Sequence, residues 1–247
     1  MKTKKIELYI HIPFCKSKCR YCDFCSFQAE NAVIDDYITK LKEELIFWGK
    51  KLTKEEVVTV FIGGGTPSYL KEQYIKEICN VIFQYFKVSE NAEITIEANP
   101  GTVDLKKLCT YRESGINRIS FGLQSTIQEE LQYLGRIHTY EQFLQCYNWA
   151  REAGFCNISV DLMSAIPKQT IHSYEKNLRT IAELSPEHIS AYSLIIEEGT
   201  PFYEDENLED LLPSEEDEVR MYQMTAQILK EYGYEQYEIS NYAKKDF

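Results

Sequence analysis

"ELYIHIPFCKSKCRYCDFC", residues 7–25, joins a predicted strand at 7–13 to a loop that carries Cys15, Cys19, Cys22 and Cys25. Their spacing is C-x3-C-x2-C-x2-C, so four thiols fall within eleven residues. Structural zinc sites usually pair two short Cys units across a longer loop, and the bacterial ferredoxin run has a different order of spacings. We therefore interpret the loop as an iron–sulfur site, with zinc and plain redox thiols as the alternatives.

Composition favours a water-soluble globular chain of cytosolic type. The 247 residues are 44% hydrophobic and 27% charged, with a formal net charge of −12. Nucleic acid and anionic membranes would repel such a chain. The N-terminus does not resemble a signal peptide, because Glu7 and His11 interrupt its apolar run, and no stretch approaches the ~18 apolar residues of a membrane span. A reducing compartment disfavours disulfides, and we expect the four scattered cysteines to be small buried hydrophobes: Cys79, Cys109, Cys146 and Cys156.

Strand and helix patterns alternate along the chain. Near-continuous apolar runs predict strands buried on both faces at 7–13, 57–62, 93–99, 118–125, 157–167 and 188–196. Helical spacing predicts helices at 32–50, 69–86, 103–115, 139–154, 172–185 and 214–233, with a shorter candidate at 126–134. Repeated strand–helix units give an α/β fold, either a doubly wound sheet or a barrel.

Polar groups and glycines stand at the ends of successive predicted strands, where parallel α/β folds collect their chemistry. The second strand ends in "GGGTP" (63–67), whose glycines allow a ligand to approach the backbone; a dinucleotide site is a weak alternative because the G-x-G-x-x-G pattern is absent. Glu97, Gln124 and Asp161 lie at the next strands. Any one of them alone would be interpreted as a helix cap or a solvated side chain. Several together, near a loop of metal-binding type, indicate a site.

At this point the chain resembles a known family. The spacing C-x3-C-x2-C after a strand, followed by a "GGGTP" turn, resembles the radical S-adenosylmethionine (SAM) superfamily. Eight motifs follow one another along the chain: "YIHIPFC", "CDF", "GGGTP", "IEANPG", "NRISFGLQS", "LGRIHT", "VDLMSAIPKQT" and "AYSLIIEEGTPF". They resemble its coproporphyrinogen dehydrogenase branch, and within it the HemW-type haem chaperones, from Tyr9 to about Ala243. The resemblance implies a partial (β/α)6 barrel and a radical SAM core domain over residues 1–247. It also implies that full-length relatives continue into a C-terminal domain that this chain lacks.

The same resemblance implies the cofactors. In the superfamily three cysteines hold a [4Fe–4S] cluster whose fourth iron binds the amino and carboxylate groups of SAM. By motif these are Cys15, Cys19 and Cys22, and Cys25 is spare. The positions that match SAM-contacting residues are Tyr9, Tyr21, Gly64, Gly65, Thr66, Glu97, Gln124, Arg136 and Asp161. Haem or a porphyrin is the further ligand implied.

Three functions fit these motifs: a haem chaperone, an oxygen-independent coproporphyrinogen III dehydrogenase that decarboxylates propionates, and a haem-degrading methyltransferase. Dehydrogenases of this branch carry their fourth cysteine one position earlier, where this chain has Phe24, and this departure favours the chaperone. We also expect Lys16, Lys18 and Arg20 to dock an acidic flavodoxin- or ferredoxin-type electron donor. Among the histidines, His11 is expected to be structural near the cluster, and His138, His172 and His188 to be surface or packing residues.

Overall fold

The computed structural model describes residues 3–247, which fold into two compact units. The first unit holds residues up to Ser17 together with Phe24–Ile119 and Asn148–Phe155. The second unit holds Lys18–Asp23, Ser120–Tyr147 and Cys156–Phe247. The cysteine loop is therefore shared, because its two central cysteines belong to the second unit and the outer two to the first.

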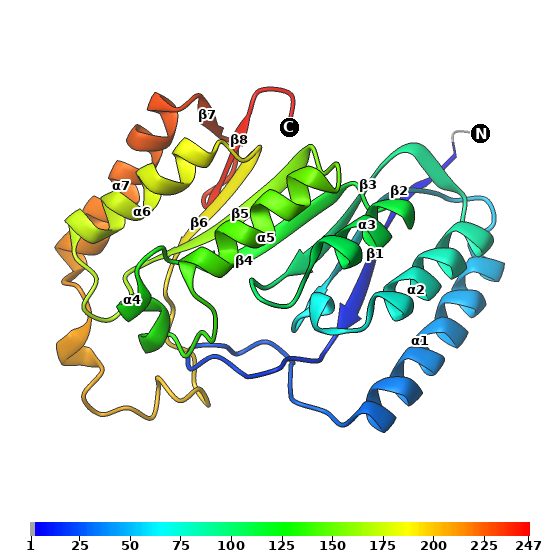
Figure 1. Cartoon of the computed structure of the whole chain (residues 1–247), viewed down its shortest axis with the longest axis horizontal. Helices are drawn as coiled ribbons and strands as arrows, with labels where there is room; N and C mark the ends of the chain where they lie inside the picture. The colour runs from blue at the N-terminus through cyan, green and yellow to red at the C-terminus, as the bar shows by residue number, and fades with distance from the viewer. Residues whose placement is uncertain (1–2) are drawn as a thin grey trace. The chain divides into compact units, whose positions relative to one another are not determined.

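The first unit is built on three parallel strands in the order β1, β2, β3. Helix α2 buries Ile75, Ile78 and Ile82, a spacing that forms one helical stripe. Helices α1 and α2 lie side by side, as the blue and cyan ribbons of Figure 1 show. The elements are β1 (Lys5–Ile12), α1 (Asn31–Lys51), β2 (Glu56–Gly64), the 3-10 helix η1 (Pro67–Tyr69), α2 (Glu72–Tyr85), β3 (Val88–Ala98) and α3 (Leu105–Glu113).

The second unit combines parallel and antiparallel pairing. Strands β5 and β6 are parallel, β8 pairs antiparallel with β6, and β7 pairs antiparallel with β8. Helices α6 and α7 lie side by side in Figure 1. Two elements, β4 (Arg118–Gln124) and α5 (Tyr140–Glu152), have residues in both units. The remaining elements are α4 (Gln128–Tyr133), β5 (Asn157–Ser164), α6 (Ile171–Leu184), β6 (His188–Ser193), η2 (Glu209–Leu211), α7 (Glu215–Glu231), β7 (Tyr234–Gln236) and β8 (Asn241–Lys244).

The strands have one apolar and one polar face. Successive side chains of a strand point to opposite faces, so Ile158, Val160 and Leu162 of β5 share one face, while Ser159 and Asp161 share the other. In β3 the same alternation separates the buried isoleucines from Glu93, Thr95 and Glu97. Both faces of these strands are nevertheless largely buried, as predicted, since Thr95 and Ser159 are 0% exposed.

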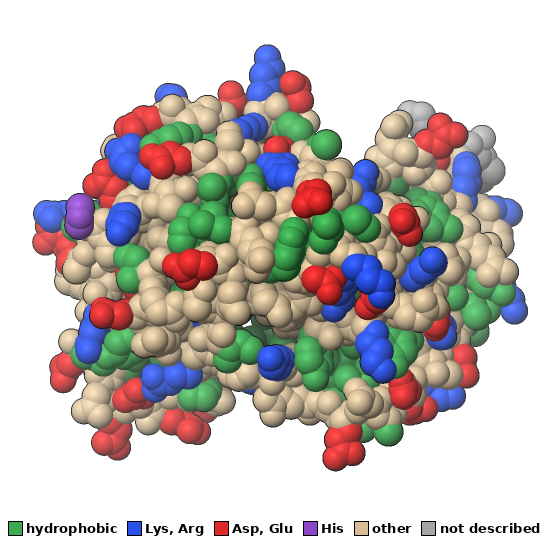
Figure 2. Space-filling model, viewed as in Figure 1, with side chains coloured by type: hydrophobic (Ala, Val, Ile, Leu, Met, Phe, Trp, Pro, Cys, Tyr) green, Lys and Arg blue, Asp and Glu red, His purple; other side chains and the backbone are tan. Residues whose placement is uncertain are grey.

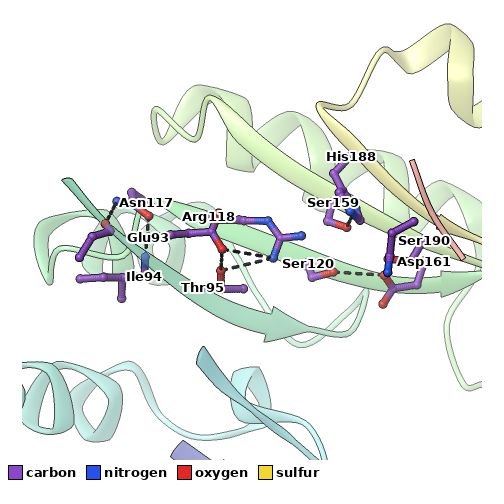
Figure 3. Close-up of polar contacts among 12 residues, drawn as sticks. Glu93, Ile94, Thr95, Asn117, Arg118, Ser120, Ser159, Asp161, His188 and Ser190 are labelled. Carbon is purple, nitrogen blue, oxygen red and sulfur yellow. Dashed lines mark hydrogen bonds and ion pairs between the residues drawn. The ribbon is translucent and has the colours of Figure 1, made fainter. Parts of the chain in front are cut away.

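The polar faces are stable because their side chains bind one another across strands. In the first unit Arg118 donates to Thr95 Oγ1 at 3.3 Å and lies 3.9 Å from the Glu93 carboxylate (Figure 3). In the second unit Ser120 Oγ donates to Asp161 Oδ1 at 3.2 Å, and Ser159 Oγ is 2.8 Å from His188 Nδ1 (Figure 3). These partners compensate for the removal of polar groups from water.

Every predicted strand and helix is present, with shifts at its ends. Strand β3 begins at Val88, five residues before the predicted start. The predicted helix 69–86 is divided, because Pro67 begins the 3-10 helix η1 and α2 starts only at Glu72. Strand β5 ends at Ser164 rather than at 167, since Ala165 takes a left-handed φ of 58° that a strand cannot contain.

Two further strands, β7 and β8, follow α7. They form a short hairpin in which Tyr234 pairs with Lys244 and Gln236 with Tyr242. The sequence pattern did not predict this hairpin. Tyr234 of β7 and Tyr242 of β8 are both buried, although the two strands have only three and four residues. Strands of this length give too few repeats for a periodic signal.

The four scattered cysteines do not share one environment. Cys79 and Cys146 are buried as expected, and burial raises the pKa of the Cys79 thiol to about 12. Cys109 is half-buried and Cys156 is exposed. The expectation of four buried hydrophobes is therefore wrong for Cys156, which precedes β5 where the chain is still outside the sheet.

The surface carries both charges, despite the net charge of −12. On the face drawn in Figure 2, acidic and basic side chains are interspersed, and neither sign forms one broad field. Ion pairs such as Lys42–Glu77 at 2.6 Å and Lys106–Glu72 at 3.0 Å connect neighbouring helices of the first unit. Among residues 3–247, no helix is both long enough and apolar enough to cross a membrane.

The histidines follow the expectation of surface or packing residues. His172 is exposed, whereas His138 and His188 are buried. His188 joins Ser159 to Tyr237, with both ring nitrogens 2.8 Å from a hydroxyl. His138 donates from Nε2 to the Leu123 carbonyl at 3.2 Å, and its burial, together with the nearby Arg136 charge, lowers its pKa to about 3.

His138 predicts a loss of stability in mild acid. Between pH 6.5 and pH 3 the unfolded chain binds a proton at this residue that the folded chain rejects, so stability falls as pH decreases through 6.5. At pH 5 the effect is about 2 kcal/mol relative to neutral pH. Urea unfolding at pH 7.5 and pH 5 should show this loss in the wild type and a smaller one in His138→Gln, which keeps a donor for Leu123. The matched change at an exposed site, His172→Gln, should leave the pH dependence unaltered; equal behaviour of both variants would contradict the assignment.

Candidate functional site

A turn of three glycines at the end of β2 lies against the end of β1. Gly65 N–H donates to the Ile12 carbonyl and Thr66 N–H to the Phe14 carbonyl, both at 2.8 Å. A Cβ on Gly65 would lie 2.9 Å from Phe14 O and 3.0 Å from Cys15 Sγ. Only glycine fits at this separation, because real Cβ atoms do not approach backbone atoms so closely.

The other two glycines are required for similar reasons. Gly64 has a φ of +118°, and a Cβ there would lie 2.6 Å from the His11 ring. A Cβ on Gly63 would lie 2.8 Å from Glu97 Oε2. That carboxylate oxygen accepts the Gly64 N–H at 2.9 Å, so Glu97 at the end of β3 fixes the turn from the side opposite β1.

Thr66 connects the turn to the first cysteine. Its Oγ1 accepts from Asn99 Nδ2 at 2.9 Å and lies 3.3 Å from Cys15 Sγ. Cys15 and Thr66 are both buried, with 8% and 4% of their surface exposed. A metal-binding cysteine is deprotonated, and a thiolate has no proton to give, so Thr66 is then the donor and Cys15 the acceptor.

Tyr9 and His11 lie beside this turn. The Cys25 carbonyl can only accept, so the 3.0 Å contact shows His11 Nε2 as the donor. In neutral His11, Nδ1 is therefore an acceptor, and Tyr9 OH donates to it at 3.0 Å. Burial and the Glu97 charge raise the Tyr9 pKa, so the phenol keeps its proton. His11 is thus structural, as expected, and the Cys25 backbone rather than its exposed thiol takes part in this arrangement.

In the second unit Arg136 reaches the second cysteine. Its Nη1 donates to Cys19 Sγ at 3.5 Å, and its Nη2 donates to the Gly122 carbonyl. Tyr21 packs against the buried cluster formed by Leu134, Met163, Ile166, Phe202 and Leu208, and burial raises the pKa of its phenol. Cys19 and Cys22 are half-buried. Two of the predicted SAM-contacting residues, Tyr21 and Arg136, are therefore in the immediate surroundings of the cysteine loop.

Gln124 and Asp161 are located at the polar strand positions of the second unit. Gln124 ends β4 with a positive φ of 75°, and its Oε1 accepts from Tyr192 OH at 2.9 Å. Asp161 accepts from Ser120, as described above. The structure therefore places Tyr9, Gly64, Gly65, Thr66 and Glu97 together in the first unit, and Tyr21, Gln124, Arg136 and Asp161 in the second.

Several residues of these arrangements were missed by reasoning from sequence. Asn99, the partner of Thr66, stands within the motif "IEANPG", so its polar side chain after a strand was an available signal. Tyr192 gave no such signal, because tyrosine in a strand is ordinary. Glu130 was also missed: it is 5% exposed, and its carboxylate accepts from Ser125, Gln169, Ser173 and Asn177.

The residues present fit a metal cluster with a bound ligand beside it. All four cysteines of the loop are free thiols, and thiolates are the usual ligands of iron–sulfur clusters. The turn next to Cys15 presents backbone groups where any side chain would intrude. Within residues 3–247, no group of three or more His, Cys, Asp or Glu side chains is already gathered as a metal site. The fit therefore rests on the chemistry of the donors and on the glycine turn.

Residues 9–181 match the radical SAM superfamily, and the chain belongs to this superfamily. Membership implies a [4Fe–4S] cluster and SAM as cofactors. The chain is 40% identical to the haem chaperone HemW of Bacillus subtilis over 238 residues, covering 96% of this chain and 63% of that protein. It is 38% identical to HemW of Escherichia coli, covering 100% of this chain and 65% of that protein. The chain thus spans slightly less than two thirds of these relatives.

Solved structures show the same fold. Coproporphyrinogen III oxidase (HemN) of E. coli, a radical SAM enzyme, superposes with a TM-score of 0.91 and 29% identity, covering 100% of this chain and 57% of that one. Elp3 of Methanocaldococcus infernus, at 16% identity and a TM-score of 0.62, shares the fold over 92% of this chain. The predicted α/β fold of the radical SAM type is confirmed.

The glycine turn predicts unequal effects of two Gly→Ala changes. Gly64 and Gly154 both have positive φ, +118° and +89°, but only at Gly64 would the new Cβ meet other atoms. Gly154→Ala should lose about 1 kcal/mol from backbone strain alone. Gly64→Ala should lose about 2 kcal/mol more, because it must also displace His11. Urea unfolding of both variants measures the difference, and equal losses would show that the turn does not need its close approach to β1.

Proposed function

We propose that this chain is the radical SAM core of a HemW-type haem chaperone. The observation that carries the proposal is the glycine turn: a Cβ on Gly65 would lie 3.0 Å from Cys15 Sγ, Thr66 Oγ1 lies 3.3 Å from the same sulfur, and Glu97 accepts the Gly64 N–H. The turn therefore brings backbone close to a cysteine sulfur, as a cluster that binds a small zwitterionic ligand requires. The similarity to HemW of B. subtilis and E. coli supports the chaperone over other members of the superfamily.

Cys15, Cys19 and Cys22 are the proposed cluster ligands. Each of the first two has a donor at its sulfur, Thr66 for Cys15 and Arg136 for Cys19. Donors of this kind stabilise thiolates and tune the potential of the iron they bind. Cys25 differs because its thiol is exposed, while its carbonyl accepts from His11. It is not a ligand in this proposal.

The proposed SAM contacts divide by chemistry. The N–H groups of Gly64, Gly65 and Thr66 are bonded within the chain, so the carbonyl groups of this turn suit the ammonium of the amino-acid end. The carboxylates of Glu97 and Asp161 suit hydroxyls or positive charge, and the phenols of Tyr9 and Tyr21 offer flat faces. Gln124 and Arg136 supply an amide and a guanidinium. When bound, the cluster supplies an electron to SAM; the residues of the chain hold and orient both.

Coproporphyrinogen III dehydrogenase is the second candidate, supported by the match to HemN over the whole chain. Against it stands Phe24, at the position where that branch has its extra cysteine; this side chain is 69% exposed and offers no ligand. The chaperone therefore remains the first choice.

An acidic electron donor is the proposed partner, in the cytoplasm. Lys16 and Lys18 are exposed on the cysteine loop, so they can attract such a donor locally despite the net charge of −12. Arg20, the third predicted docking residue, forms an ion pair with Asp205 at 2.8 Å. This ion pair reduces the positive charge that Arg20 adds to the proposed docking patch of Lys16, Lys18 and Arg20.

The ligand assignment predicts which cysteine variants lose iron. After anaerobic reconstitution, Cys15→Ala, Cys19→Ala and Cys22→Ala should lose the cluster, because three thiolates are its only ligands from the chain. Cys25→Ala should retain the iron content and the reduced-state EPR signal of the wild type. Cys156→Ala is the control for an exposed cysteine outside the loop. Loss of the cluster in Cys25→Ala would favour a closed site with four cysteines.

The SAM site predicts a contrast between two glutamates of β3. Glu97→Gln should weaken SAM binding about tenfold, the size of one charge-assisted hydrogen bond, while still accepting the Gly64 N–H. Glu93→Gln, on the same face of the strand and ion-paired to Arg118, should leave the affinity unchanged. Titration calorimetry of the reconstituted protein measures both. Equal weakening would place SAM elsewhere.

Haem binding and decarboxylation, measured on the reconstituted protein, distinguish a chaperone from an enzyme. Three of the four histidines are already hydrogen-bonded in the fold, and only His172 is exposed. Few axial ligands for haem are therefore offered, and residues 1–247 should show only weak haem binding by the Soret band. A protein extended to the length of the HemW relatives should bind haem tightly and leave coproporphyrinogen III unchanged in product chromatography. Decarboxylation by that longer protein would favour the dehydrogenase.

A further inference from the structure

Arg20, between the second and third cysteines of the loop, is fixed on both sides of its backbone. Its N–H donates to the Leu134 carbonyl at 3.0 Å, and its carbonyl accepts from Phe202 N–H at 3.1 Å. Leu134 and Phe202 belong to one buried cluster and are 0% and 1% exposed. The loop is therefore attached at this residue to the rigid part of the second unit.

The Arg20 side chain repeats this attachment. Its Nη2 donates to Asp205 Oδ2 at 2.8 Å, and its guanidinium carbon lies 5.0 Å from the centre of the Phe202 ring. The two charged side chains are 38% and 26% exposed. An ion pair and a cation–π contact thus act on the same guanidinium, at a position partly shielded from water.

Gly135 makes room for Arg20. It has a φ of +73°, and a Cβ there would lie 3.0 Å from Arg20 Cγ and 3.2 Å from Arg20 N. The next residue, Arg136, donates to Cys19 Sγ. One turn therefore contacts both Arg20 and the sulfur of Cys19.

We propose that Arg20 is a positioning residue for the cluster ligands: it fastens the loop between Cys19 and Cys22 to Phe202 and Asp205. The inference rests on the proposed ligand set, because it assigns Arg20 the task of holding two of those three thiols at a fixed place. It differs from docking of an electron donor, the role that the charge of Arg20 suggested from sequence. If Arg20 positions the loop, it needs Asp205 as its partner. If Arg20 docks a donor, Asp205 weakens docking because it neutralises the Arg20 charge.

The two roles predict opposite effects of one variant. If Arg20 positions the loop, Arg20→Met and Asp205→Asn should act in the same direction, because each removes one end of the same attachment. If Arg20 docks an acidic donor, Arg20→Met should slow reduction by flavodoxin and Asp205→Asn should accelerate it. The exposed pair Arg220–Glu216 of α7, at 2.7 Å, provides the matched control through Arg220→Met.

The first measurement uses the protein without its cluster. Amide hydrogen exchange of the peptide containing residues 18–23, and of the one containing Phe202, should be about fivefold faster in Arg20→Met and in Asp205→Asn than in the wild type, the size expected for one ion pair with a cation–π contact. Arg20→Lys should restore part of the protection, and Arg220→Met should not change it. Unchanged exchange in both Arg20→Met and Asp205→Asn would overturn the proposal. Asp205→Asn keeps the size of the side chain, so the test stands even where Arg20→Met unfolds.

The second measurement uses the reconstituted protein. Loss of iron to a chelator should be faster in both variants, and reduction by dithionite and by flavodoxin should change together. Faster reduction by flavodoxin in Asp205→Asn with unaltered iron retention would instead assign Arg20 to docking. A wild-type-like cluster in Cys19→Ala would overturn the proposed ligand set, and the exchange of the cluster-free protein distinguishes that failure from a failure of the Arg20 attachment.

Discussion

The approach of the Gly63–Gly65 turn to the end of β1 is the constraint on which the site of the first unit depends. Two backbone hydrogen bonds continue the pairing of β1 with β2 beyond the ends of both strands. They carry Thr66 to Cys15, and they leave Gly64 N–H directed at Glu97. The first cysteine is consequently placed by the end of the sheet together with its own loop, since Cys15 N–H also donates to the Phe27 carbonyl at 3.0 Å.

At the strand ends of the second unit, several residues have a strained backbone that neighbouring contacts must stabilise. Gln124, Ala165 and Lys168 all have positive φ, and none is a glycine. Each such residue costs about 1–2 kcal/mol and persists only where its surroundings hold it. The buried Glu130 carboxylate provides this support, because its four donors come from the segments after β4 and β5 and from α6. A network with all partners present is rigid, so Gln124 is presented at the end of β4 in a fixed orientation.

Prediction from sequence succeeded where a signal repeats or where a motif is dense. Helical spacing over a dozen residues predicted α1, α2, α6 and α7, and in α7 an acidic first turn follows the Ser214 cap, where the helix dipole favours negative charge. The polar faces of β3 and β5 were missed, because counting apolar residues along a strand averages over both faces. Partners such as Asn99 for Thr66 or Tyr192 for Gln124 lie 33 and 68 residues away. Nothing in a single sequence pairs positions so distant, so the groups that hold the predicted site residues could not be predicted.

Arg20 makes directed contacts that set it apart from the two lysines beside it in the sequence. Three basic residues within five positions suggest one patch, yet the loop turns so that Lys16 and Lys18 remain exposed while Arg20 meets Asp205 and Phe202. The difference lies in chemistry as well as in place. A guanidinium is flat and weakly hydrated, so it can bind a carboxylate and an aromatic face at once, whereas an ammonium is best left in water. The lysines of this stretch can attract a partner, because long-range electrostatic attraction needs only charge. Its arginine can stabilise the conformation of the loop, because a fixed loop needs directed contacts.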